Sequence, residues 1–244
     1  MSQQHSFSDL LARLQSRRWP WVVIAFLSVA LVVIAHNVFQ VWLYMKPCEQ
    51  CVYIRFGFLV IALGALFPIL APKAFWSKVA ATVFGVYGAV YGLMCSVKLS
   101  NIHHAIHSDD LDAMFGMQGC SLEPHYPFGL PLEKWAPDWF LPTGDCGYDN
   151  SDVPVGTVLS PLQESIINMY NDAGGWYLIP PYKFMSMAQC CELAFGVALL
   201  LILALAWGAV KDKMVSRCFL AFFVTFLKNR ARPRPDKTQA GFSL

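Results

Sequence analysis

The sequence predicts an all-α integral membrane protein, a four-transmembrane-helix bundle with a long irregular loop on its outer side. The first observation is composition: of 244 residues, 56% are hydrophobic, 14% are aromatic and only 14% are charged, whereas soluble domains carry about 25% charged residues. The second observation is four uncharged apolar runs, each close to the roughly 20 residues that cross a bilayer. The third is an uneven distribution of Lys and Arg between the loops, which sets orientation.

The four predicted spans cover about residues 20–42, 51–71, 77–97 and 188–210. The second run is the shortest, and it reaches back to Cys51 only if Arg55 lies near the membrane surface. The spans leave two outer loops, at about 43–50 and 98–187. Together they form one membrane domain over residues 19–210.

Basic residues flank the spans on one side of the membrane, namely Arg13, Arg17, Arg18, Lys73, Lys78 and eight Lys and Arg after the fourth span. The segment 98–183 instead carries three basic and eleven acidic residues. Because cytoplasmic flanks carry an excess of Lys and Arg, we expect residues 1–18 and the basic tail 211–244 to be cytoplasmic and both outer loops to face away from the cytoplasm. Attraction to anionic lipid accounts for the tail without any nucleic-acid partner.

This topology divides the eight cysteines into two groups. Cys48 and Cys51 lie at the outer start of the second span, and Cys120 and Cys146 lie in the long outer loop. The other four, expected to be small buried hydrophobes or reduced cytoplasmic thiols, are Cys95, Cys190, Cys191 and Cys218. The outward-facing cysteines therefore form two pairs suited to thiol–disulfide exchange.

The first pair lies in Pro47-Cys48-Glu49-Gln50-Cys51. Proline favours the first helical turn, so Pro47 predicts the start of the second span. Free N–H groups and the helix dipole at that end lower a thiol pKa. Arg55 follows Cys51 by four residues and shares its helix face, so it can hold a thiolate there. Because an Arg in an apolar segment is costly, we interpret it as functional, with a snorkelling anchor as the alternative.

Other interpretations of these cysteines remain open. A C-x-x-C pair also occurs in zinc and copper sites, and His103, His104 and His107 could supply ligands, although they lack a second paired spacing. We therefore predict no metal site, while a metal-sensing or metal-transporting protein stays an alternative. The loop pair, 26 residues apart in Pro- and Gly-rich sequence, is equally compatible with a structural staple.

The chain resembles the DsbB family of membrane protein-thiol:quinone oxidoreductases, and more closely its DsbI branch. The resemblance covers roughly residues 20–210 and rests on three segments, Cys48-Glu49-Gln50-Cys51-Val52-Tyr53-Ile54-Arg55, Leu130-Pro131-Leu132-Glu133-Lys134-Trp135 and Gly144-Asp145-Cys146. A quinone reductase like vitamin K epoxide reductase is the nearest enzymatic alternative. It places its C-x-x-C near the end of a late helix, whereas here the pair opens the second span.

The resemblance implies a multi-pass protein of the bacterial inner membrane, with both termini cytoplasmic and the redox loops periplasmic. Its activity would be to reoxidise a periplasmic thioredoxin-fold thiol oxidase, DsbA- or DsbL-like, and to pass the electrons to ubiquinone or menaquinone. Such an enzyme would support disulfide bond formation in exported proteins.

Residue by residue, the resemblance also implies roles. Cys120 would form the mixed disulfide with the partner, and Cys146, once released, would attack the Cys48–Cys51 pair at Cys48. Cys51 would then become the thiolate that donates electrons to the quinone, with Arg55 beside it.

His107 lies at the family spacing before Cys120 and is expected to line the quinone pocket. The residue before Arg55 is commonly acidic in the family, whereas Ile54 occupies it here. The loop after Cys146 is longer than in typical members and repeats apolar residues at helical spacing, at Leu159, Leu162, Ile166 and Tyr170. It predicts an amphipathic helix in the outer interface, or one packing on the bundle.

Overall fold

The computed structural model describes residues 7–107 and 120–230. Within these residues, four helical segments are long and apolar enough to cross a membrane: Trp19–Trp42, Glu49–Leu70, Phe75–Ile106 and Met187–Gly208. The first combines α2 (Trp19–Ile34) with a π-helical continuation, η1 (Ala35–Trp42). The others are α3 (Glu49–Leu70), α4 (Phe75–Ile106) and the first half of α9 (Met187–Arg230). The four-span prediction is confirmed.

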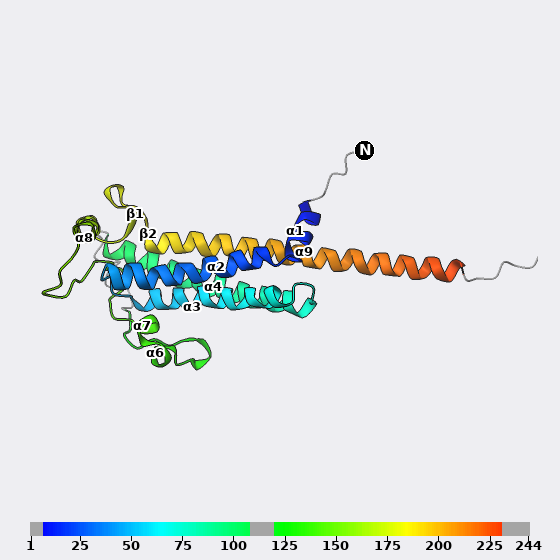
Figure 1. Ribbon diagram of the computed structural model, residues 1–244, viewed down its shortest axis with the longest axis horizontal. Helices are drawn as coiled ribbons and strands as arrows, with labels where there is room; N and C mark the ends of the chain where they lie inside the picture. The colour runs from blue at the N-terminus through cyan, green and yellow to red at the C-terminus, as the bar shows by residue number, and fades with distance from the viewer. Residues whose placement is uncertain (1–6, 108–119, 231–244) are drawn as a thin grey trace, which may run out of the picture.

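The spanning helices run side by side, and the connecting elements gather at one end of the bundle (Figure 1). That end holds η2 (Pro127–Gly129), α6 (Leu132–Trp135), α7 (Pro137–Phe140), α8 (Pro161–Ala173) and a two-stranded antiparallel sheet, β1 (Tyr177–Ile179) and β2 (Phe184–Ser186), joined by η3 (Pro180–Tyr182). The short helix α1 (Phe7–Gln15) and the extension of α9 lie at the opposite end.

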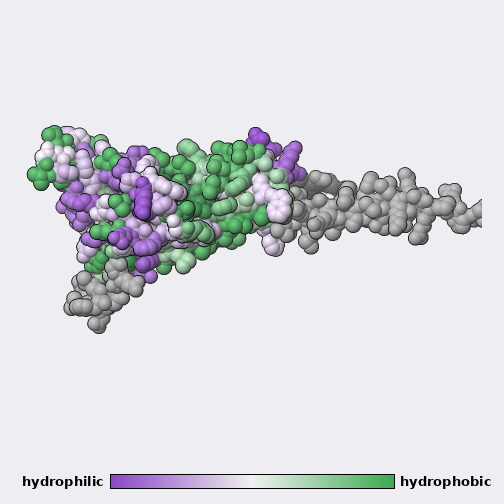
Figure 2. Space-filling view, turned by 90° about the horizontal axis from the view of Figure 1, so that it is seen from below, coloured by the Kyte–Doolittle hydropathy of each residue, from purple (hydrophilic) through white to green (hydrophobic). Residues whose placement is uncertain are grey.

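The outer surface of the bundle matches a lipid environment. Figure 2 shows hydrophobic residues covering the middle of the molecule, with hydrophilic residues gathered over the loop end. Large apolar side chains such as Phe26, Leu200 and Met94 point outward from three different spanning helices. Because soluble monomers rarely expose large continuous apolar patches, this belt is what a bilayer would cover.

Glycines let α3 and α4 approach closely. A Cβ atom on Gly88 of α4 would lie 2.7 Å from the Gly57 carbonyl oxygen of α3, and one on Gly57 would lie 3.1 Å from the Gly92 Cα atom. Small residues at such contacts are typical of packed helices in membranes. Helix α3 thereby becomes the central helix, with Val52 and Ile61 almost fully buried.

The helix α4 runs to Ile106, past the expected end at residue 97. Leu99, Ile102 and Ala105 are buried, so the last turns are held by packing beneath the loop rather than by lipid. The outer loop thus begins nine residues later than the apolar run suggested, at His107. Besides the expected helix, now α8, the loop contains a small sheet that the sequence did not predict.

Helix α8 confirms the expected helical spacing and packs on the bundle. Ile166, Ile167 and Tyr170 contact a cluster that includes Leu43 and Trp176. The bundle-packing alternative therefore accounts for most of its apolar face, while Leu162 is exposed. In the expected cytoplasmic tail, the backbone stays helical to Arg230, and residues 231–244 lie outside the described residues, as do residues 1–6.

Candidate redox site

The first cysteine pair caps helix α3. Cys48 is the N-cap residue in an extended conformation, and its sulfur accepts a hydrogen bond from the Cys51 amide at 3.2 Å. The helix begins at Glu49, so Pro47 precedes it by two residues instead of forming its first turn. Cys48 and Cys51 are joined in a disulfide with a Cα–Cα distance of 5.0 Å. Cys48 is only 2% exposed, whereas Cys51 is half-buried.

The second pair, Cys120 and Cys146, is also joined, with a Cα–Cα distance of 5.8 Å. The chain reaches this position because the Thr143 and Gly144 amides both donate to the Pro47 carbonyl, at 2.9 and 3.1 Å. A Cβ atom on Gly144 would lie 2.8 Å from the backbone oxygen of Lys46. Glycine is therefore required where this loop crosses the segment that leads into Cys48.

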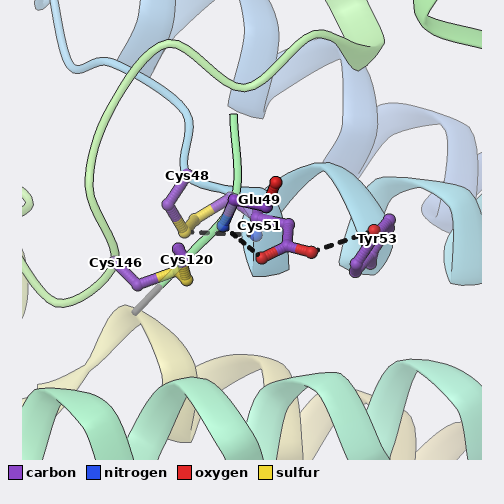
Figure 3. Close-up of a disulfide and its surroundings, with 7 residues drawn as sticks. Cys48, Glu49, Cys51, Tyr53, Cys120 and Cys146 are labelled. Carbon is purple, nitrogen blue, oxygen red and sulfur yellow. Dashed lines mark hydrogen bonds between the residues drawn. A yellow bond between two sulfur atoms is a disulfide. The ribbon is translucent and has the colours of Figure 1, made fainter. Parts of the chain in front are cut away.

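A hydrogen-bonded clamp fixes the other side of the loop. The Glu49 carboxylate accepts from the Ser121 amide at 2.8 Å and from the Tyr53 hydroxyl at 3.1 Å. That hydroxyl in turn accepts from the His125 amide at 2.7 Å. Figure 3 shows the Glu49 side chain between Tyr53 and the segment that follows Cys120. Glu49, one of the two residues between the cysteines of the first pair, therefore positions the second pair.

The two disulfides consequently lie beside each other at the loop end of the bundle (Figure 3). All four cysteines belong to one packed cluster, in which Cys48 and Cys146 are buried and Cys51 and Cys120 are partly exposed. Exchange between disulfides requires a thiolate to attack a neighbouring sulfur. This arrangement brings two pairs that are 72 residues apart in sequence, from Cys48 to Cys120, within reach of that chemistry.

A cavity of about 260 Å³ opens next to Cys51. Its walls are mainly apolar side chains from α2, η1, α3 and α9, and its polar lining groups include Arg55 and Asp149. Leu31 and Ile34 line it and are also exposed on the outside of the bundle, so the cavity reaches the surface that lipid would cover. Small-molecule sites are typically apolar clefts, about 300–1,000 Å³ in volume, with a few placed polar groups.

Arg55 is 5% exposed and anchors a polar network inside the bundle. Its Nη1 atom donates to the Gln40 side-chain oxygen at 2.9 Å and to the Trp139 carbonyl at 3.0 Å. A guanidinium has five N–H donors, so these bonds leave the Nε and Nη2 hydrogens for other acceptors. Gln40 sits on η1, and π-helical turns often occur at functional sites. Sequence reasoning missed Gln40, because only the fold brings it to Arg55.

His107 was expected to line the quinone pocket, whereas the structure places Asp149 in the cavity wall and His107 outside it. The His107 ring is exposed, with Nδ1 2.8 Å from the His103 carbonyl and Nε2 3.0 Å from the Gly174 carbonyl. Among the described residues, the walls of the cavity do not include His107, but they do include Asp149. Burial raises the pKa of the Asp149 carboxyl to about 6, opposed by the nearby His107. No sequence motif marked this residue, which lies three positions after Cys146.

The remaining described cysteines are not disulfide-bonded. Cys95 is buried, as expected, whereas Cys190 and Cys191 are half-buried and line the cavity. The side chain of Cys218 lies outside the described residues. Among the side chains that the structure describes, no group of three or more His, Cys, Asp or Glu is arranged to hold a metal ion.

Comparison with known proteins gives a consistent result. The family model described as "Disulfide bond formation protein DsbB" matches residues 17–206. A protein-disulfide oxidoreductase DsbI of Escherichia coli O1:K1 / APEC is 49% identical over 202 residues, which is 82% of this chain and 91% of that protein. The protein-disulfide oxidoreductase DsbI of Salmonella typhimurium (strain LT2) is 47% identical, over 82% of this chain and 90% of its own length. The chain is therefore a protein-disulfide oxidoreductase of the DsbB family, and within that family it belongs to the DsbI branch.

Proposed function

We propose that this protein reoxidises a periplasmic thioredoxin-fold thiol oxidase, DsbA- or DsbL-like, and passes the electrons to a membrane quinone. The observation that carries the proposal is the position of Cys51. It belongs to a disulfide that lies beside a second disulfide, and it also lines an apolar cavity that reaches the lipid-facing surface. One cysteine therefore has access both to a thiol relay and to a lipid-soluble electron acceptor.

The exposure of the four cysteines supports an order for the relay. A partner thiolate attacks the half-buried Cys120, which leaves Cys146 as a thiolate. Cys146 attacks the adjacent Cys48 and frees Cys51. Both central sulfurs, at Cys48 and Cys146, belong to residues no more than 5% exposed. They are thus shielded from other thiols, while the two end positions are the accessible ones.

The cavity fits a quinone headgroup in chemistry and position. Aliphatic and aromatic side chains form most of its wall, and Arg55 offers N–H donors and a positive charge to a molecule bound there. A bound quinone would supply the two-electron accepting chemistry at this site. Cys51 would deliver the electrons, Arg55 would hold a carbonyl oxygen and stabilise the Cys51 thiolate, and the apolar wall would exclude water. Ubiquinone and menaquinone share these features, and both are candidates.

The proposed location is the bacterial inner membrane, with the disulfide end of the bundle in the periplasm. Arg17, Arg18, Lys73 and Lys78 lie at the ends of helices remote from the disulfides. Basic residues of this kind favour the cytoplasmic side. Both termini would then be cytoplasmic, and the cysteine pairs would lie in the compartment where disulfides persist.

The test is quinone reduction by the purified protein in lipid nanodiscs, supplied with a reduced thioredoxin-fold oxidase. The absorbance of a soluble ubiquinone or menaquinone analogue should fall, with one quinol formed for each partner disulfide. Replacing Cys51 or Cys120 by Ala should abolish turnover, while Cys95→Ala, at a buried thiol outside both pairs, should retain it. Partner oxidation without quinol formation would overturn the proposal.

A further inference from the structure

We propose that Asp149 is the residue that donates a proton to the quinone during its reduction. This inference rests on the proposed quinone reductase activity, which it deepens by naming the acid at the same site. Asp149 lines the cavity together with Cys51 and Arg55. The cavity thus holds an electron source, a cation and a carboxyl group.

The backbone holds Asp149 from both sides. Before it, Gly147 has a φ of +83° and passes so close to the end of α4 that a Cβ atom would lie 2.5 Å from Ile106. After it, Ser151 forms a β-bridge with Met45, and the Asp152 amide donates to the Tyr44 carbonyl at 3.0 Å. The positive φ favours glycine, and the resulting turn carries the chain from the Cys146 disulfide over α4. Asp149 is therefore a fixed part of the cavity wall.

Titratable groups from several elements surround the Asp149 carboxyl. His107 at the end of α4, Tyr177 on β1 and Cys191 on α9 interact with it electrostatically. Two cations, Lys46 and Arg55, also line the cavity, and the Lys46 ammonium is paired with Asp152. His107 favours the charged carboxylate, but burial dominates and raises the pKa of Asp149 to about 6. A general acid works best when its pKa is near the operating pH.

The proton balance defines the step. Reduction of a quinone to a quinol takes two electrons and two protons. The Cys48 and Cys51 thiols supply the two electrons when their sulfurs join, and they release two protons. Asp149 donates one proton to a quinone oxygen and regains it from water, and the other quinol proton also comes from water. The net reaction therefore neither takes up nor releases protons.

Negative charge at the site promotes this step. A thiolate at Cys51 lies on the same cavity wall and raises the proton affinity of the carboxyl, since like charges disfavour ionisation. Asp149 is consequently more protonated in the reduced enzyme than in the oxidised one. Because its side chain is half-buried, water can restore the proton after each turnover.

Three variants test the assignment: Asp149→Asn, Asp149→Glu and the control Asp172→Asn, which changes an exposed acid on α8. Loss of a general acid typically slows a reaction by about 10²–10⁴-fold. We expect Asp149→Asn to lower kcat for quinone reduction by at least about 10²-fold with little change in quinone affinity. Asp149→Glu should recover part of the rate, and Asp172→Asn should match the wild type.

The pH profile supplies an independent prediction. Only the protonated acid donates, so wild-type kcat should fall as pH rises through the pKa of Asp149 in the reduced enzyme, which lies above its value of about 6 in the disulfide form. The Asp149→Asn profile should be flat over the same range. Infrared difference spectra need no quinone. In the disulfide form they should show a carboxyl band that titrates near pH 6 and disappears in Asp149→Asn. When the disulfides are reduced, the titration of this band should move to higher pH.

The outcomes separate the two proposals. If the wild type reduces quinone but Asp149→Asn keeps both its kcat and its pH profile, the proton-donor assignment is wrong and the proposed function stands. A carboxyl band titrating near the ordinary aspartate value of about 3.9 would also overturn the assignment. If the wild type reduces no quinone under any condition, the proposed function itself fails.

Discussion

The Glu49 clamp predicts a specific defect in the relay. When the partner opens the Cys120–Cys146 disulfide, Cys120 is no longer tied to the bundle by a covalent bond. Two hydrogen bonds then hold the segment after Cys120 on α3. The Ser121 amide donates to Glu49 at 2.8 Å, and the His125 amide donates to the Tyr53 hydroxyl at 2.7 Å. Cys120 must return to release Cys48 from Cys146, so loss of the clamp should slow that closing step.

The magnitude follows from the bonds involved. A hydrogen bond to a charged group contributes about 1.5–3 kcal/mol, and the lower end applies because the Glu49–Ser121 bond is exposed. Glu49→Ala should therefore slow closure by roughly tenfold, since about 1.4 kcal/mol corresponds to a factor of ten. Glu49→Gln keeps the acceptor oxygen but loses the charge, so its effect should be about half as large in free energy.

The assay is a quenched single turnover with reduced partner, followed by mass-spectrometric mapping of disulfides. In Glu49→Ala the Cys48–Cys146 intermediate should accumulate, while the first mixed disulfide through Cys120 forms at the wild-type rate. Tyr53→Phe should resemble Glu49→Ala, and the double variant should be less than additive because the two side chains share one hydrogen bond. Equal intermediate levels in all four proteins would refute the positioning role of Glu49.

Three further predictions concern Gly144, Gly88 and Arg55. Gly144→Ala should slow attack of Cys146 on Cys48 in the same assay, because its methyl group would lie 2.8 Å from the Lys46 backbone and push the loop outward; unchanged kinetics would contradict this. Gly88→Ala should lower the midpoint of thermal unfolding, since overpacking costs about 1–3 kcal/mol. The control Gly196→Ala should leave the midpoint unchanged, because no atom lies within 4 Å of the new Cβ. Equal midpoints in the two variants would disprove the close α3–α4 contact. Arg55→Met should weaken quinone binding and leave the Gln40 and Trp139 oxygens without their donor. Arg55→Lys keeps the charge but loses the planar fork, so it should retain part of the quinone affinity. Wild-type quinone affinity in Arg55→Met would mean that Arg55 is only an anchor.

The membrane fold was predictable because it depends on how apolar and charged residues are distributed along the chain. A run such as Trp19–Trp42 without a charged residue has few alternatives to crossing a bilayer. The end of α4 was not predictable, because Leu99 and Ile102 are held by tertiary packing above the apolar run. Local hydropathy cannot distinguish a helix that continues into a loop from one that stops at the membrane surface.

The candidate site, like the fold, could be predicted only in part. Cys48, Cys51 and Arg55 could be selected because their spacing on one helix start has chemical meaning. No sequence feature indicated a role for Glu49, since its partner Ser121 is 72 residues away. Asp149 was missed for a similar reason: only the turn at Gly147 and the bridge at Ser151 bring it to the cavity.

The central claim is that electrons enter at Cys120, cross to Cys48 and leave from Cys51. Disulfide mapping of the protein mixed with a reduced partner that keeps only its attacking cysteine tests it most directly, because this partner cannot resolve its own adduct. We expect a partner adduct through Cys120, a disulfide between Cys146 and Cys48, and a free thiol at Cys51 that reduces quinone only after Cys120 returns. An adduct through Cys48 or Cys51, or a Cys48–Cys51 disulfide that stays intact while Cys146 is free, would show that the relay runs by another path.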